Sequence, residues 1–174
     1  GLSDKLIKNF PNVIPINILK YNFNDIPNPF WVAGFTSGDG SFHLKLSSTE
    51  ANIGFRVSLI YSFHLHIRDL EVLKGLCHYI FNYFNQNILS IPVGEKKIYI
   101  SNDNSVHLQI TNFTDILEKI IPFFDKYPIL GIKRLDFEDF KKVSQIVKSK
   151  KHLTPEGIKT ILEIKSNMNQ NRKY

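Results

Sequence analysis

The chain has 174 residues, of which 43% are hydrophobic and 22% are charged. These fractions are typical of a globular protein with a buried core, and they exclude a disordered chain. No apolar run approaches the ~20 residues of a membrane-spanning helix, and a single cysteine, Cys77, excludes an internal disulfide and a thiolate zinc cage. The formal charge of +6 favours a polyanionic partner.

The first part of the chain, residues 1–27, carries apolar side chains without a sustained period and contains three prolines. We predict a short helix at residues 4–10, followed by an extended segment that acts as a linker. The remaining residues, 28–174, are long enough to bury the core of one domain.

Residues 29–42 predict a short helix that turns directly into a strand. Asn28 can cap its first turn, and a proline occupies the first helical position. Gly34 and Gly38 are four residues apart and so share one face, which Ala33 keeps nearly free of side chains. Each glycine costs about 1 kcal/mol relative to alanine in a helix. We therefore expect a close contact with another backbone to recover that cost.

Asp39 ends this predicted helix. A carboxylate at a helix C-terminus meets the negative end of the dipole, at a cost of about 0.3–1 kcal/mol. Together with the free carbonyl groups of the last turn, however, it forms a cluster of oxygens suited to a hard divalent cation. We interpret Asp39 as a candidate metal ligand; the alternative is a glycine-rich turn with an exposed acid.

After this helix the hydrophobic period changes from 3.6 to 2. We predict strands at 41–47 and 54–64 joined by a hairpin loop at 48–52, and a second hairpin at 97–101 and 105–111. In the second hairpin we expect these residues to face inward: Ile98, Ile100, Val106, Leu108 and Ile110. The other face of the sheet is polar and cationic, and it carries Ser41, His43, Lys45, Ser47, Arg56, Ser58, Ser62, Lys97, Tyr99, Ser101, His107 and Gln109.

Such a face is suited to the major groove of DNA, although an ordinary solvated sheet face would have a similar composition. Ile60 lies among these polar positions, where it can contact a thymine methyl group or shield a neighbour. His64 and His66 share one side of their strand and are candidates for a transition-metal site, but hydrogen bonding or DNA contact explains His64 equally well.

The other predicted elements are helices. Asp69 is the expected cap of a helix through about Phe81, and Asn112 or Thr114 of a helix through about residue 124. Two further helices are predicted at about 131–149 and, after Thr154, at 155–168. The Asn-rich residues 82–96 receive no assignment. The order α-β-β-α-β-β-α followed by helices indicates an α+β fold with helices on the apolar face of a four-stranded antiparallel sheet.

Residues 32–40, Val-Ala-Gly-Phe-Thr-Ser-Gly-Asp-Gly, resemble the nine-residue signature of the LAGLIDADG homing endonucleases. Residues 62–69, the region of Ile132 and Lys133, and residues 151–157 resemble the later half of two-motif members that fungal mitochondrial introns encode. The segment before residue 28 is similar to the linker between the two halves. The resemblance implies a LAGLIDADG domain that works in the mitochondrion.

The resemblance also implies a chemistry. Asp39 and the carbonyl of Gly38 would coordinate Mg²⁺, or another divalent cation such as Mn²⁺ or Ca²⁺. Two domains would pair through the face of Ala33, Gly34 and Gly38, bring two acids together, and cut across the minor groove to leave 3′ overhangs. Lys133 matches a basic residue near the scissile phosphate, with Arg134 as the alternative.

Three positions depart from the family pattern. Ser37 stands where the signature has its first acid, and Leu65 and Asp69 stand where some relatives have polar or arginine side chains, so those roles do not transfer. We expect a sequence-specific endonuclease for double-stranded DNA, active as a homodimer or with an amino-terminal half that this chain lacks. The alternatives are an RNA-binding maturase acting on intron RNA, and a DNA-binding half-domain without cleavage activity.

Overall fold

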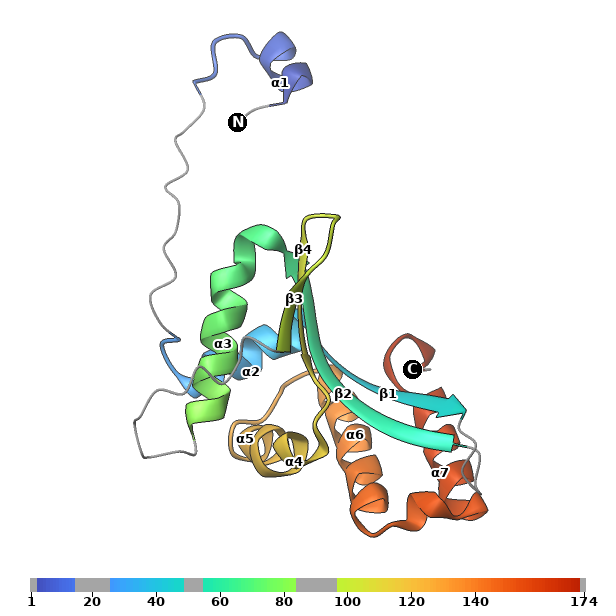
Figure 1. The fold of residues 1–174 in the computed structure, drawn as a ribbon. Helices are drawn as coiled ribbons and strands as arrows, with labels where there is room; N and C mark the ends of the chain where they lie inside the picture. Colours follow the sequence, from blue (N-terminus) through green and yellow to red (C-terminus); the bar gives the residue numbers. More distant parts are fainter. Residues whose placement is uncertain (1–2, 15–25, 49–54, 84–96, 173–174) are drawn as a thin grey trace.

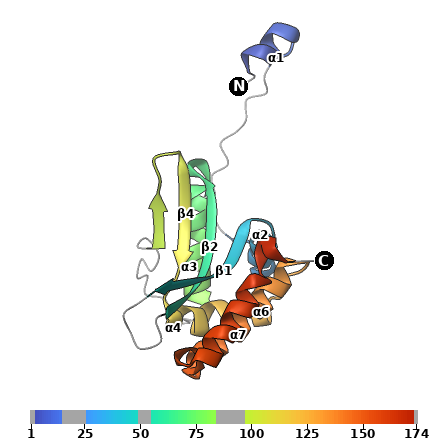
Figure 2. The same ribbon diagram turned by 90° about the vertical axis from the view of Figure 1, so that its right-hand side faces the viewer.

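The computed structural model describes residues 3–14, 26–48, 55–83 and 97–172. Four antiparallel strands form one sheet in the order β1-β2-β4-β3. The strands are β1 (Gly40–Ser48), β2 (Phe55–His66), β3 (Ile98–Ile100) and β4 (Ser105–Ile110). Helices cover one face of the sheet and leave the other face open (Figures 1 and 2). The predicted α+β fold with a four-stranded antiparallel sheet is therefore confirmed.

Helix α2 (Pro29–Asp39) begins as its sequence predicts, because the Asn28 side chain accepts a hydrogen bond of 2.9 Å from the Trp31 N–H. It ends directly at β1. A Cβ atom at Gly40 would lie 2.8 Å from the carbonyl oxygen of Thr36, so only glycine permits this tight turn. Thr36 of α2 and Tyr61 of β2 are both buried, and their hydroxyl groups share a hydrogen bond of 2.8 Å. This contact attaches α2 to the middle of β2.

The pairing of β1 with β2 fixes the two faces of the sheet. Polar residues of β1 lie opposite polar residues of β2, as in Ser41 opposite Ser62 and Lys45 opposite Ser58. Residues that are paired in this way share a face, and their sequence neighbours point to the opposite one. Most of these neighbours are buried in the core, as the alternation predicted: Phe42, Leu44, Leu59, Tyr61 and Phe63. Leu46 and Val57, nearer the hairpin end, are partly buried and pack against it.

Helix α3 (Leu70–Tyr83) follows a 3-10 turn at Ile67–Asp69. The expected cap at Asp69 is wrong, because the ring of His66 accepts the hydrogen bond of the first turn from the Arg68 N–H, at 3.2 Å. Asp69 itself lies inside that turn. The tertiary path from β2 into α3 therefore starts the helical region three residues earlier than the sequence pattern indicated.

The predicted helix at 114–124 is divided into three parts, and Asn112 caps it. They are α4 (Phe113–Asp115), the π-helical turn η3 (Ile116–Ile120) and α5 (Ile121–Lys126). Pro122 has no N–H to donate to the preceding turn, and this missing hydrogen bond accompanies the widened π-helical turn.

The remaining helices are α1 (Asp4–Asn9), α6 (Lys133–Lys148) and α7 (Pro155–Ser166). The Thr154 hydroxyl caps α7 by accepting from the Gly157 N–H at 3.1 Å, as predicted. None of the helices in the described ranges is long and apolar enough to cross a membrane.

Ile100 is a correction to the predicted inward face, because its side chain is 59% exposed. It is the last residue of β3, an edge strand with β4 as its one neighbour in the sheet. The expected hairpin loop, most of the expected linker and most of the Asn-rich segment lie outside the described residues. The boundary of the domain at residue 28 stays a prediction.

Replacing Tyr61 by Phe removes one partner of the buried hydrogen bond that holds α2 on the sheet. A buried hydroxyl group without a partner costs about 1–3 kcal/mol. We expect urea unfolding of Tyr61→Phe to show a loss of that size, and the double variant Thr36→Val, Tyr61→Phe to recover part of it. An equal loss in both proteins would contradict this account of the contact.

Candidate functional site

The two candidate catalytic residues lie at the same end of α2. The Lys133 ammonium group donates a hydrogen bond to the carbonyl of Gly40, the residue after Asp39, across 93 positions of sequence. One turn of chain earlier, the Ser37 hydroxyl donates to the carbonyl of Leu130 at 2.9 Å. These contacts hold the start of α6 against the C-terminus of α2, so the spacing in sequence gave no indication of this proximity.

The Asp39 side chain is exposed, and within the described part of the chain its carboxylate has no hydrogen bond or ion pair. It lines a hollow of about 450 Å³ at the end of β2, together with Phe35, His64, Leu65, His66, Arg68, Asp69 and Val72. The described residues contain no group of three or more His, Cys, Asp or Glu side chains that could hold a metal ion. The expected pairing of His64 and His66 on a metal therefore finds no third ligand in the described residues. Asp39 stays the candidate ligand for a hard cation at this end of the helix.

Gly34 and Gly38 lie on an exposed face of α2. A Cβ atom at either position would meet no atom within 4 Å, so this face is open in the single chain. Phe30, at the same spacing one turn earlier, is 63% exposed. Ala33 is a correction: its side chain is 5% exposed and belongs to the hydrophobic core, because it lies on the inner side of the helix.

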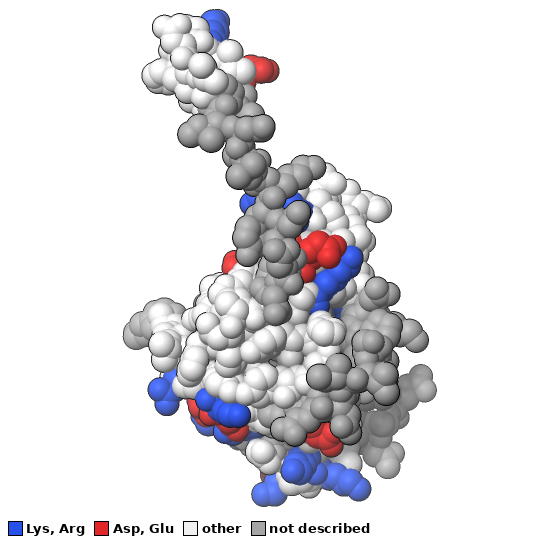
Figure 3. Space-filling model, turned by 90° about the vertical axis from the view of Figure 1, so that its left-hand side faces the viewer, with Lys and Arg blue, Asp and Glu red and all other residues white. Residues whose placement is uncertain are grey.

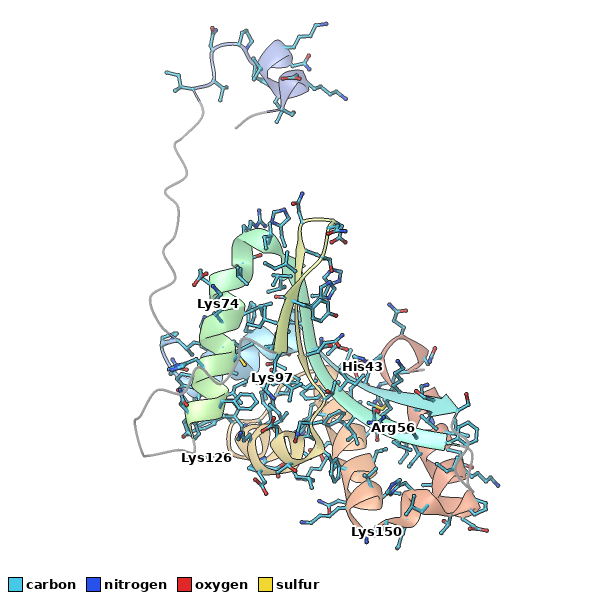
Figure 4. The ribbon with its side chains drawn as sticks, viewed as in Figure 1. His43, Arg56, Lys74, Lys97, Lys126 and Lys150 are labelled. Carbon is cyan, nitrogen blue, oxygen red and sulfur yellow. The ribbon has the colours of Figure 1, made fainter. Side chains whose placement is uncertain are left out.

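The open face of the sheet joins β1, β2 and β4 through their register. Ser62 lies between Ser41 of β1 and Gln109 of β4, and it shares the face with both. Figure 4 shows His43 on the edge strand β1 and Arg56 on its neighbour β2. Ile60, opposite His43, is 8% exposed and lies outside the main core cluster, so it covers part of this polar face.

Three aromatic rings stack across the strands at the other end of this face. The His107 ring lies 4.1 Å from that of His64 and 4.6 Å from that of Tyr99, nearly parallel to both. The Ser105 hydroxyl lies 2.5 Å from an Asp103 oxygen and 3.1 Å from His107 Nε2. The Ser105 hydroxyl donates its hydrogen bond to the Asp103 carboxylate, which lowers the pKa of Asp103. The serine oxygen can then accept a hydrogen bond from His107 Nε2–H.

Burial, and then the neighbouring His64, lower the pKa of His107 below its ordinary value, while Asp103 acts in the opposite direction. The neutral form of His107 is thus favoured, and its contact with the Ser105 hydroxyl suits a proton on Nε2. The sequence identified His64, Tyr99 and His107 through strand alternation. It did not identify Asp103 and Ser105, because they enter the arrangement through a turn.

The position of Lys97 also corrects the prediction. It was expected on the open face, but its ammonium group lies 2.5 Å from an Asp115 oxygen and 4.5 Å from the centre of the Phe81 ring, on the helical side. Lys97 precedes the first residue of β3, so strand alternation does not extend to it, and the carboxylate of Asp115 attracts it. Figure 3 shows charged side chains of both signs at the lower end of this side of the molecule and again higher up, with uncharged surface between the two groups.

The neutral state of His107 has a consequence for pH. Its contribution to stability is fully present above the ordinary pKa of 6.5 and is lost as the pH falls through the lowered native value. We expect Asp103→Asn to lower the pKa of His107 further and His64→Gln to raise it, as NMR titration of the imidazole would show. A His107 pKa that rises in Asp103→Asn would contradict the arrangement.

Known proteins are similar to this chain in sequence and in fold. A model of the LAGLIDADG endonuclease family matches residues 32–144. The chain is 36% identical to a probable intron-encoded endonuclease 3 of Neurospora crassa, over 92% of this chain and 28% of that protein. The structure is similar to that of the I-SmaMI LAGLIDADG homing endonuclease bound to cleaved DNA, with a TM-score of 0.85 and 37% identity, over 99% of this chain and 54% of that one.

The same endonuclease bound to an uncleaved DNA target in the presence of calcium ions gives a TM-score of 0.83 and 37% identity, over 97% of this chain and 54% of that one. The chain thus spans about half the length of these solved proteins and 28% of the Neurospora relative. The family match covers more than half of its residues, and its signature lies on α2 with Asp39 at the helix end. The chain belongs to the LAGLIDADG endonuclease family.

Proposed function

We propose that this chain is one of two paired domains of a sequence-specific, metal-dependent DNA endonuclease. The observation that carries the proposal is Asp39, an exposed acid without a partner in the described chain, at the end of a helix whose Gly34–Gly38 face is open. Lys133 donates a hydrogen bond to the carbonyl of the next residue, Gly40. An acid at the negative end of a helix is stabilised by a cation, and an open glycine face by a second helix.

Pairing supplies what one chain lacks. Cleavage of two strands needs two carboxylates close together, and the described residues place one at the end of α2. Close packing of two such helices through Gly34 and Gly38 would bring two Asp39-type acids side by side. The second domain is either a second copy of this chain, which suits a near-palindromic site, or another LAGLIDADG domain.

The oxygen groups at this helix end fit a hard divalent cation. The Asp39 carboxylate and the Gly38 carbonyl would hold it, and both ligand types suit Mg²⁺, Mn²⁺ or Ca²⁺. A bound ion of this kind neutralises phosphate charge and lowers the pKa of a water molecule. Lys133 would hold the phosphate or that water through its ammonium group, which donates to the carbonyl of Gly40, the residue after Asp39. Arg134, exposed on the same helix, is the alternative basic residue for this role.

The open sheet face would lie along the major groove of double-stranded DNA. Its polar residues on β1, β2 and β4 share one face through their register, and their hydroxyl, amide and imidazole groups can hydrogen-bond to base edges. Tyr99 and Ser101 of the second hairpin extend this surface, and Ile60 supplies an apolar contact. We further propose, on the family resemblance, that the protein works in the mitochondrion.

Replacing Asp39 by Asn tests the catalytic proposal. The carboxylate has no partner in the described chain, so the variant should fold normally. With the target selected from a randomised DNA library and Mg²⁺ present, we expect a loss of cleavage of at least about 100-fold, with DNA affinity in EDTA changed less than threefold. Asp125→Asn, at an exposed acid paired with Lys141 on α6, is the matched control. Cleavage at wild-type rate by Asp39→Asn would overturn the assignment.

Gly34→Leu separates the fold of one domain from its pairing. Because a side chain at Gly34 meets no atom of this chain, the variant should unfold at the same or a slightly higher urea concentration. We expect it to have the mass of one chain by light scattering under conditions in which the unaltered chain, with DNA and Mg²⁺, has the mass of two.

The control for that experiment is Thr160→Leu, which adds the same side chain to the exposed surface of α7. It should pair as the unaltered protein does. Two chains per particle in Gly34→Leu would show that α2 is not the pairing surface. A single chain in the unaltered protein would mean that a different LAGLIDADG domain is its partner.

A further inference from the structure

A second hollow lies where the end of the chain folds back against β1. It has a volume of about 450 Å³, and its polar lining comes from Ser41, His43, Lys165, Asn169, Gln170 and Asn171. Figures 1 and 2 both place the C-terminal turn beside the first part of β1. The sequence pattern gave no functional role to residues 165–171.

The wall of this hollow is firmly attached to the domain. The Asn169 side chain donates a hydrogen bond of 3.0 Å to the carbonyl of Phe42, on the outer edge of the sheet, and its backbone N–H donates to Asp136 at 2.9 Å. The Arg172 guanidinium then joins Asp136 and Asp139, at 2.7 Å and 2.8 Å. The polar groups of the C-terminal turn are therefore held in a fixed position beside β1.

The charges around the hollow leave it positive. Asp136 and Asp139, the acids that hold the turn, are compensated by Arg172, and Asp139 also by Lys142. Lys165 makes no ion pair within the described residues, and it lies close enough to His43 to lower, after burial, the pKa of that imidazole. The hollow thus combines a cation and a neighbouring imidazole with serine and amide groups. Such an environment stabilises a bound anion.

We propose that this hollow binds a backbone phosphate of the DNA substrate through Lys165 and His43, with Ser41 and the side-chain amides of Gln170 and Asn171 as further donors. The inference rests on the proposed function, because the anion is identified as a DNA phosphate from the position of the hollow beside the proposed DNA-binding face. Ser41 is two residues from Asp39 and stands on the open face of the edge strand β1. A duplex along that face would carry its backbone past this edge, near the phosphate that is cut.

The alternative explanation for Lys165 is purely structural, because a lysine in the last turn of a helix interacts favourably with the dipole. The two explanations differ in salt dependence. Each phosphate contact that is lost reduces the slope of log affinity against log salt by about 0.9 for duplex DNA. A lysine that only stabilises α7 changes the unfolding midpoint and leaves this slope unaltered.

The experiment measures fluorescence anisotropy of a labelled 30-base-pair duplex pool of mixed sequence, in EDTA and at several NaCl concentrations. We expect Lys165→Gln to bind a few-fold more weakly and with a slope smaller by about 0.9, and Lys165→Arg to keep the slope. Lys159→Gln, six residues earlier on another side of the same helix and exposed, removes the same charge without touching the hollow and should keep it too. In NMR titrations, the duplex should raise the pKa of His43 in the unaltered protein.

The outcomes separate this inference from the proposed function. If the unaltered protein binds no duplex, both proposals fail. If it binds with a salt-dependent slope that Lys165→Gln and Lys159→Gln share, the phosphate site alone is wrong. A slope that falls for single-stranded RNA and not for the duplex would assign the hollow to RNA and overturn its assignment to DNA. Urea unfolding of each variant shows whether a changed slope comes from a damaged fold.

Discussion

Helix α2 passes into strand β1 with no loop between them, and the positions of the candidate groups depend on this turn. It is possible because Gly40 has no side chain at a point where a Cβ atom would lie 2.8 Å from the Thr36 carbonyl. Asp39 is therefore the last helical residue, and Ser41 is already on the open face of the sheet. The candidate metal-binding acid and the sheet surface proposed to contact DNA are thus separated by two residues and by no flexible segment.

Contacts from distant parts of the chain hold this turn in place. The buried hydrogen bond between Thr36 and Tyr61 fixes the helix on β2, and Lys133 and Leu130 bind its C-terminal end through Gly40 and Ser37. The elements involved are the motif helix, the central strand and the start of α6. A change in the packing of any of them would move Asp39 relative to the sheet.

The sequence predicted those parts of the fold in which one buried face determines the pattern. In β1 and β2, alternation is strict, and a shift of one residue would expose Phe42 and Tyr61, so their faces follow from the sequence. At the ends of elements the prediction failed, because tertiary contacts decide there. Lys97 is drawn to Asp115, Asp69 is replaced as a cap by His66, and Ile100 is left exposed at an edge.

For the candidate site, the sequence indicated Asp39 because its environment is local: a helix end and two glycines within five residues. The proximity of Lys133 came from family resemblance alone, since 93 positions separate it from Gly40. The Asp103–Ser105–His107 arrangement and the hollow beside Lys165 were not predicted, because they arise where a turn and the chain end meet strands. Residue spacing in the sequence does not indicate contacts between segments that are brought together only by the tertiary fold.

Several aspartates of the structure contrast with Asp39. Asp103 is held by Ser105, Asp115 by two lysines, and Asp136 and Asp139 by Arg172, so these carboxylates have partners within the chain. Asp39 has none in the described residues and also meets the unfavourable end of a helix dipole. The exposed face of Gly34 and Gly38 on the same helix has likewise no neighbour in this chain. Both features are unfavourable in the isolated domain, and under the proposed function both would become favourable on binding of a cation and a second helix.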